Sequence, residues 1–163
     1  MFLTEIQQIL PYMPNVRGVY YLPFFMQHLS ELNGTEMYTK ASLSRESFET
    51  HIQYQSSMGP AITAFVHNKP VAVFGCVIIW NGVGEAWSLL SEESRRYPIA
   101  MTKAGIAFID IVEILFRLHR VQITVKTLDA RAIKWAKALG FQSEGILKEY
   151  SADKEDYNIL RRT

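Results

Sequence analysis

The chain has 163 residues, of which 48% are hydrophobic and 20% charged. This composition predicts one globular domain that can bury its own core. The formal net charge is +1, so nothing indicates a nucleic-acid partner or an anionic membrane surface. Cys76 is the only cysteine, which excludes an internal disulfide and a cysteine-based zinc site and favours a reducing, cytoplasmic location. The N-terminus lacks a basic segment followed by a long apolar run, so we expect no signal peptide.

The most apolar stretch of the chain, residues 99–118, is interrupted by four charged residues. A membrane-spanning helix tolerates few charges, because each one is costly to move into the bilayer. The chain has four histidines, His28, His51, His67 and His119. They lack the short spacings typical of metal ligands. We therefore expect neither a membrane association nor a metal site.

The first 60 residues divide into two parts. Pro11, Pro14 and Pro23 break the first 40 residues into short segments, for which we expect short helices or loops. Ser44 is then a suitable N-cap for a helix over residues 45–57, and the sequence Gly-Pro follows the end of that helix.

Three strand-like segments come next, at residues 61–66, 71–80 and 83–90. The middle segment is almost wholly apolar and includes Cys76, which predicts a core cysteine on a strand buried on both faces. A turn at residues 67–70 separates the first two segments. The sequence Asn-Gly at residues 81–82 predicts a type I′ hairpin between the other two. Together these features predict an antiparallel meander.

A long helix and a strand follow a polar loop. Pro98 stands where the first turn of a helix tolerates a missing N–H, and we expect this helix over residues 98–117. Residues 119–126 then alternate apolar and polar side chains, which predicts a strand. A strand, a crossover helix and a second strand imply at least one parallel pair.

The last third of the chain contains one further helix. Asp129 is suited to cap a helix over residues 130–139, and Gly140 to end it. Two short strands near residues 141–150 and 155–162 complete the order β-β-β-α-β-α-β-β. The predicted fold class is α/β, with a mixed central sheet of an antiparallel meander and a parallel pair, flanked by helices.

Residues 129–145 carry the most specific pattern in the chain. A capped short helix ends in the sequence Leu-Gly-Phe, and a Glu-Gly pair follows within a few residues. This helix-to-strand corner resembles the C-terminal signature of the GNAT acetyltransferases, with Asp129 in the place of the family's Asn. Together with the meander, long helix and strand before it, the resemblance covers residues 61–162.

The resemblance implies a domain organisation. The whole chain, residues 1–163, would form a single GNAT-like domain. Residues 61–163 would be its acetyl-CoA-binding core, and residues 1–60 would supply the acceptor side or a lid. Tyr20 and Phe24 belong to an aromatic group in that first region.

A loop before the long helix is the family's other characteristic feature, because its backbone N–H groups hold the pyrophosphate of coenzyme A. The resemblance implies cofactor contacts in this loop from Arg95, Arg96, Tyr97 and Ala100. Pro98 replaces the family's middle glycine and has no N–H, so the phosphate cradle is incomplete. Arg95 and Arg96 would compensate by contacting the phosphates directly. Otherwise they are solvated residues of a charged turn.

Acetyl transfer to an amine needs a base for the amine proton and N–H groups that polarise the thioester carbonyl. The resemblance implies that Glu85 is the base; otherwise it is a solvent-facing strand residue. Backbone amides of Leu89, Leu90 and Ser91 would form the acetyl-binding edge, provided that their strand splays as it does in the family. Asp129 would contact the cofactor at the start of its helix.

Two departures from the family leave several functions open. Pro98 weakens the phosphate loop, and Ala136 stands where many members have a tyrosine that protonates the thiolate. The first hypothesis is an acetyl-CoA-dependent N-acetyltransferase acting on a primary amine of a protein, peptide or small molecule. The alternatives are an inactive binding or virion-assembly protein and a sensor that binds coenzyme A without turnover.

The virion-assembly alternative rests on a second resemblance. Residues 83–87 and the altered loop resemble small GNAT-related proteins of tailed bacteriophages, some of which are internal virion proteins. A phage-encoded chain would act in the host cytoplasm with a phage or host protein as partner. GNAT folds also often form homodimers through their C-terminal strands.

Overall fold

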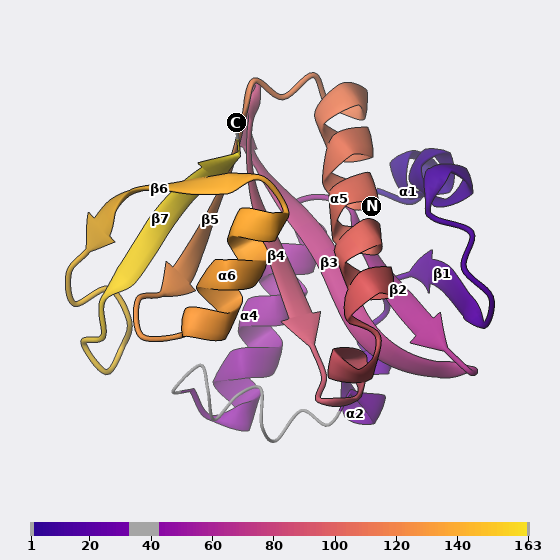
Figure 1. Ribbon diagram of the computed structural model, residues 1–163, viewed down its shortest axis with the longest axis horizontal. Helices are drawn as coiled ribbons and strands as arrows, with labels where there is room; N and C mark the ends of the chain where they lie inside the picture. Colours follow the sequence, from indigo (N-terminus) through magenta and orange to yellow (C-terminus); the bar gives the residue numbers. More distant parts are fainter. Residues whose placement is uncertain (1, 33–42, 163) are drawn as a thin grey trace.

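The computed structural model describes residues 2–32 and 43–162, which form a seven-stranded mixed sheet with helices on both faces (Figure 1). The strand order is β1-β2-β3-β4-β5-β7-β6. All neighbouring strands are antiparallel except β4 and β5, which are parallel. The predicted α/β class and mixed sheet are therefore confirmed. The strands are β1 (Val19–Pro23), β2 (Ala61–Val66), β3 (Lys69–Trp80), β4 (Val83–Leu90), β5 (Arg120–Lys126), β6 (Phe141–Leu147) and β7 (Tyr157–Arg162).

Helices cover both faces of this sheet. In Figure 1, α5 and α6 lie in front of the sheet, and α4 lies behind it. The helices are α1 (Leu3–Ile9), α2 (His28–Glu31), α4 (Arg45–Ser57), α5 (Pro98–Leu115) and α6 (Ala130–Ala138), with 3-10 turns η1 (Leu10–Tyr12) and η2 (Glu93–Arg96). None of the helices in the described part of the chain is long and apolar enough to cross a membrane.

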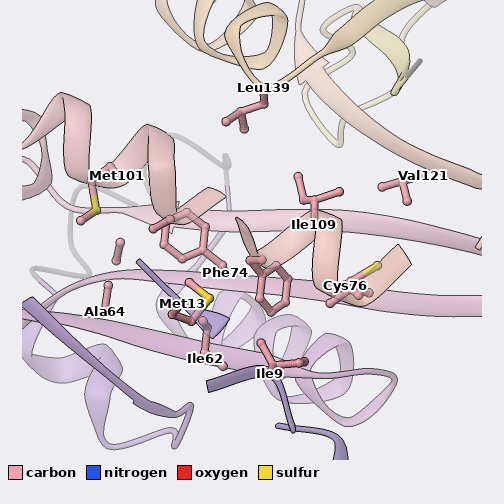
Figure 2. Close-up of a cluster of buried hydrophobic side chains, with 14 of the residues drawn as sticks. Ile9, Met13, Ile62, Ala64, Phe74, Cys76, Met101, Ile109, Val121 and Leu139 are labelled. Carbon is pink, nitrogen blue, oxygen red and sulfur yellow. The ribbon is translucent and has the colours of Figure 1, made fainter. Parts of the chain in front are cut away.

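The larger hydrophobic core lies between the sheet, α1 and α5 (Figure 2). Phe74 of β3 packs against Phe108 of α5, with ring centroids 6.4 Å apart, and Ile9 of α1 is completely buried. Cys76 lies in the same core, where burial raises the pKa of its thiol to about 12. The predicted core role of Cys76 is thus confirmed, because a thiol with such a pKa stays protonated at neutral pH.

A second, smaller core lies on the other face of the sheet. Phe48 and Ile52 of α4 are buried there together with Val73 of β3. The indole of Trp87 lies directly over Gly75, because a Cβ at Gly75 would be only 2.3 Å from the ring. The absence of a side chain at residue 75 therefore makes room for Trp87 on the α4 face of β4.

The predicted helix ends are mostly confirmed, because local side chains define them. The Ser44 hydroxyl accepts a hydrogen bond from the Ser47 amide at 3.2 Å at the start of α4. Asp129 accepts one from the Ala132 amide at 3.0 Å at the start of α6. Gly140 follows α6 with φ +99°, the left-handed region that favours glycine.

Two expectations for the first half of the chain are wrong. Residues 19–23 form the edge strand β1 and pair with β2, although the proline-rich sequence predicted only short helices or loops. The strand β3 is buried only from Pro70 to Cys76, and Trp80 at its end is 67% exposed. An apolar run cannot show where the covering helices stop, so it predicted too much burial.

The two hairpin turns also differ from expectation. His67 and Asn68 have φ values of 50° and 65°, so the type I′ turn connects β2 to β3. At the predicted position, Gly82 has φ +85°, but the φ of Asn81 is not positive. The turn at residues 81–82 is therefore not of type I′, which needs positive φ at both residues. The carbonyl of Gly82 accepts hydrogen bonds from two β5-side amides, His119 at 2.8 Å and Arg120 at 3.1 Å. These tertiary contacts, which the local sequence does not encode, hold this second turn.

Candidate functional site

The parallel pair of β4 and β5 is short, and the two strands part in the middle of the sheet. Val83, Gly84 and Glu85 pair with residues 120–122 of β5. Beyond Glu85, β5 continues beside β7, and no strand in the described part of the chain pairs with residues 86–90 on that side. The strand pairing is therefore interrupted from Ala86 to the carboxyl end of β4, from which the chain continues into η2 and α5 (Figure 1). We call this unpaired stretch between β4 and β5 the gap.

The backbone of β4 presents one of the three predicted amides to this gap. The Ser91 amide donates to the Val71 carbonyl at 3.1 Å, so it is already used by β3. Hydrogen-bonded and non-hydrogen-bonded pairs alternate along an antiparallel ladder. Leu89, paired with Val73, therefore also points its N–H toward β3. Leu90, paired with Ala72, belongs to a non-hydrogen-bonded pair. Its N–H therefore points away from β3, toward the gap.

Side-chain hydrogen bonds fix the connection between β4 and α5. The Ser91 hydroxyl donates to the Val71 carbonyl at 2.7 Å, and the Ser94 hydroxyl donates to the Ser91 carbonyl at 2.5 Å. Both serines are buried. Ser91 therefore anchors the loop to β3, a structural task that differs from its predicted contact with a cofactor.

The two loop arginines lie on the surface beside acidic neighbours. Arg95 is 3.8 Å from Glu92, and Arg96 is 3.9 Å from Glu93. Both guanidinium groups are exposed, so these pairs are weak and the side chains can reorient at little cost. Each arginine is therefore accessible to an anion, which would have to compete with the negative charge of the adjacent carboxylate.

The N-terminus of α5 offers a small number of backbone donors. Tyr97 donates its N–H to the Ser94 carbonyl at 3.0 Å, and Pro98 has no N–H. The N–H groups of Ile99 and Ala100 lie in the first turn, where a helix supplies no intrahelical acceptor. Two amides and the positive end of an 18-residue helix therefore remain to attract an anion.

A contact between two helices braces this same helix end. The Trp135 indole of α6 donates to the Thr102 hydroxyl at 3.1 Å, and that hydroxyl donates to the Pro98 carbonyl at 2.7 Å. Trp135 is the sequence neighbour of Ala136. Its role in holding the first turn of α5 could not be found without knowing that the two helices meet.

Glu85 lies at the point where the two strands part. Its side chain is half-buried, and its Oε1 accepts a hydrogen bond from Gln122 Nε2 at 2.9 Å. Trp87, two residues later on the same strand face, packs edge-to-face against Phe24 with ring centroids 6.4 Å apart. Glu85 is therefore neither a fully solvated strand residue nor an isolated carboxylate. It is a hydrogen-bonded carboxylate beside an aromatic surface.

Helix α6 contains no tyrosine. Ala136, which stands at the position of the family's tyrosine, is 2% exposed and belongs to the core. Asp129 uses one carboxylate oxygen as the cap of α6, and its other carboxylate oxygen takes no part in this cap.

On the α4 face of the sheet, His28 Nδ1 lies 2.7 Å from the Thr63 hydroxyl, and burial lowers the pKa of this histidine. No motif in the sequence singled out His28.

A polar cavity of about 400 Å³ lies elsewhere, between α5, the start of β5 and the end of β7. Arg162 on its wall pairs with Asp110 at 2.7 Å and with Glu113 at 3.0 Å, and it donates to the Leu139 carbonyl at 3.1 Å. These bonds connect the C-terminal strand to α5. The charged groups on the wall of this cavity are therefore paired with one another and have a structural role.

Comparisons with solved structures define the fold. The acetyltransferase RimL, which acts on the α-amino group of ribosomal L7/L12, matches with a TM-score of 0.72 over 92% of each chain, at 17% identity. A GNAT-family acetyltransferase from Streptococcus pneumoniae matches with a TM-score of 0.65 over 88% of this chain and 98% of the other, at 14% identity. The microcin C7 self-immunity acetyltransferase MccE, solved with acetyl-CoA and AMP, matches with a TM-score of 0.72 over 94% and 97%, at 16% identity.

The chain therefore has the fold of the GNAT acetyltransferases, as the pattern at residues 129–145 indicated. Neither a protein-family profile nor a curated protein sequence matches the chain. Among residues 2–32 and 43–162, no cluster of three or more histidine, cysteine, aspartate or glutamate side chains could hold a metal ion.

Proposed function

We propose that this protein is an acetyl-CoA-dependent N-acetyltransferase that acts on a primary amine. The observation that carries the proposal is the parting of β4 and β5 after Glu85, beside the N-terminus of α5. This gap combines an unpaired strand edge, two free helix amides and a carboxylate. The solved structure of MccE contains acetyl-CoA on the same fold, which supports the same donor here.

The residues present fit such a donor. The Leu90 N–H faces the gap and would donate to the thioester carbonyl oxygen, where negative charge develops as the amine attacks. The N–H groups of Ile99 and Ala100 would face the pyrophosphate. Arg95 and Arg96 would add direct phosphate contacts after leaving their acidic neighbours. Bound acetyl-CoA would supply the acetyl group as an activated thioester.

Glu85 would receive the proton that the amine loses during attack, directly or through one water molecule. Its position at the last paired residue of β4 places it between the unpaired edge and the α4 face. Since Ala136 cannot act as an acid, the leaving thiolate would take its proton from solvent. A thiolate is a good leaving group at neutral pH, so the reaction does not require a fixed acid.

The acceptor amine would approach from the α4 face of the sheet, which carries Glu85 and the contacting rings of Trp87, Phe24 and His28. Some structural neighbours act on protein α-amino groups. For this chain the acceptor would be a primary amine of a protein, a peptide or a small molecule. Such an enzyme would act in the cytoplasm.

An inactive binding or virion-assembly protein is the second candidate. Pro98 removes one donor from the phosphate cradle, and Ala136 removes the usual acid. Glu92 and Glu93 also partly neutralise the two loop arginines. A protein of this kind would have a phage or host protein as its partner, or would pair with a second copy of itself.

Calorimetric titration with acetyl-CoA separates the two candidates. We expect micromolar binding to the wild-type protein. The double variant Arg95→Ala, Arg96→Ala should bind about tenfold more weakly, because each exposed arginine contributes less than a buried one would. A matched double variant on the exposed face of α6, Arg131→Ala and Lys134→Ala, should bind normally. No detectable binding at millimolar acetyl-CoA would reject the acetyltransferase and favour the binding protein.

A further inference from the structure

A chain of side-chain hydrogen bonds runs from Glu85 across β5 to β6. Glu85 Oε1 accepts from Gln122 Nε2 at 2.9 Å, and Gln122 Oε1 accepts from Arg120 Nε at 2.9 Å. The other two nitrogens of the Arg120 guanidinium donate to the Glu144 carboxylate, at 2.6 and 3.4 Å. Arg161 of β7 also pairs with Glu144, at 3.3 Å. The carboxylate at the parting of the strands is thus connected to an ion-pair cluster at the sheet edge.

This chain fixes which way the Gln122 amide points. A guanidinium group has donors but no acceptor, so the carbonyl oxygen of Gln122 has to face Arg120. Its NH2 group then has to face Glu85. The opposite orientation would place NH2 against the guanidinium and the carbonyl oxygen against a carboxylate, with both hydrogen bonds lost. Hydrogen bonds to charged groups contribute more than neutral ones, so this orientation is strongly preferred.

Glu144 in turn holds Arg120 in place. The Arg120 hydrogen bond keeps the pKa of the Glu144 carboxyl below its usual value, and Arg120 and Arg161 act in the same direction through their charge. Glu144 therefore stays ionised at neutral pH and continues to accept both bonds. Backbone pairing of β4 and β5 also keeps Gln122 next to Glu85, because the two residues are partners in the last parallel pair.

We infer that Gln122 is a positioning residue that holds the Glu85 carboxylate at the mouth of the gap. This inference rests on the proposed function, in which Glu85 is the base. Gln122 occupies Oε1 and leaves Oε2 to take the proton from the amine. A base transfers a proton well only within hydrogen-bond reach of it, and supporting hydrogen bonds keep a catalytic side chain within that range. Arg120 acts one step further away, by fixing the amide of Gln122.

Gln122→Met tests the inference, because methionine keeps the length of the side chain and removes its donor. We expect kcat to fall about tenfold, equivalent to about 1.4 kcal/mol, with little change in the KM for acetyl-CoA. In a Glu85→Gln background the same substitution should change kcat less than twofold, because Gln122 would then have no base to position. Gln142→Met, the same change on the exposed edge strand β6, should leave kcat unchanged in both backgrounds.

Equal effects of Gln122→Met in both backgrounds would overturn the inference while leaving the proposed function intact. A wild-type protein without turnover would instead overturn the proposed function, and the catalytic part of this inference with it. The contact itself has a readout that needs no activity. The side-chain amide NMR signals of Gln122 should shift on Glu85→Gln and on Arg120→Met, but not on Gln142→Met. Signals that stay in place would also reject the positioning contact.

Discussion

The two ends of β4 differ in how tightly their polar groups are held. At the paired end, Glu85 and Gln122 belong to a hydrogen-bonded chain that continues through Arg120 to the sheet edge. At the open end, Leu90 lies on an unpaired edge, and exposed arginines follow it with only weak partners. The paired end holds one carboxylate in a fixed position, whereas the polar groups at the open end have few or weak partners.

Under the proposed function, the two ends of β4 have different tasks. Holding a base requires a fixed geometry, and the hydrogen bond from Gln122 of β5 to Glu85 of β4 supplies it. Under the same function, binding a large anionic donor requires N–H groups and positive charge. Pro98 removes one N–H group, and Glu92 and Glu93 offset the charge of the two loop arginines. We therefore expect substitutions at the paired end to alter kcat and substitutions at the open end to alter affinity. Three experiments test this division, and a fourth tests the N-cap of α6.

The largest effect is expected from Glu85→Gln, which removes the proposed base and keeps the shape of the side chain. We expect kcat to fall on the order of 1000-fold, because general-base catalysis accounts for effects of this size. The KM for acetyl-CoA should stay within about twofold, since Glu85 does not face the phosphates. Steady-state kinetics with acetyl-CoA and an amine acceptor measure both values. Full turnover by this variant would remove Glu85 from the mechanism.

Leu90→Pro should have the next largest effect, because it removes the N–H that faces the gap. This N–H takes no part in the β3–β4 ladder, so the strand pairing should survive. We expect kcat/KM to fall on the order of 100-fold, as for the loss of one donor to a developing oxyanion. Leu90→Ala is the matched control and keeps the N–H. Equal loss in both variants would show that the side chain matters and the amide does not.

Pro98→Ala should strengthen acetyl-CoA binding, because it restores a backbone N–H donor at the first turn of α5. We expect acetyl-CoA to bind about fivefold more tightly, close to the 1 kcal/mol typical of one added hydrogen bond. Calorimetric titration measures the change. Lys103→Ala, one turn further along α5 and exposed, is the control. An unchanged affinity would mean that the first turn of α5 does not contact the donor.

The smallest effect is expected from Asp129→Ala, which removes the N-cap of α6. The lost hydrogen bond to Ala132 should lower the free energy of unfolding by about 1 kcal/mol. For a domain of this size, that corresponds to a fall of about 2–4 °C in the melting temperature. Asp129→Asn keeps the cap and should melt with the wild type. An additional loss of acetyl-CoA affinity in both variants would show that the carboxylate also contacts the donor.

The sequence alone determined the helix-to-strand corner and most of the element boundaries. Local chemistry is sufficient there, because Ser44 and Asp129 cap helices through contacts three residues away. Gly140 ends α6 because it can adopt a positive φ. The alternation of apolar residues likewise predicted β5, and the pattern as a whole predicted the mixed sheet and its GNAT fold.

Only the tertiary structure decided which polar groups meet. Gln122 and Glu85 are 37 residues apart in sequence, and nothing in either local pattern connects them. The alternating ladder decided that Leu90 faces the gap while the predicted Leu89 and Ser91 face β3. The contact of Trp135 with Thr102 depends on α5 and α6 lying side by side. Side-chain pairing across strands and helices follows from register and packing, and neither is written in the neighbours of a residue along the chain.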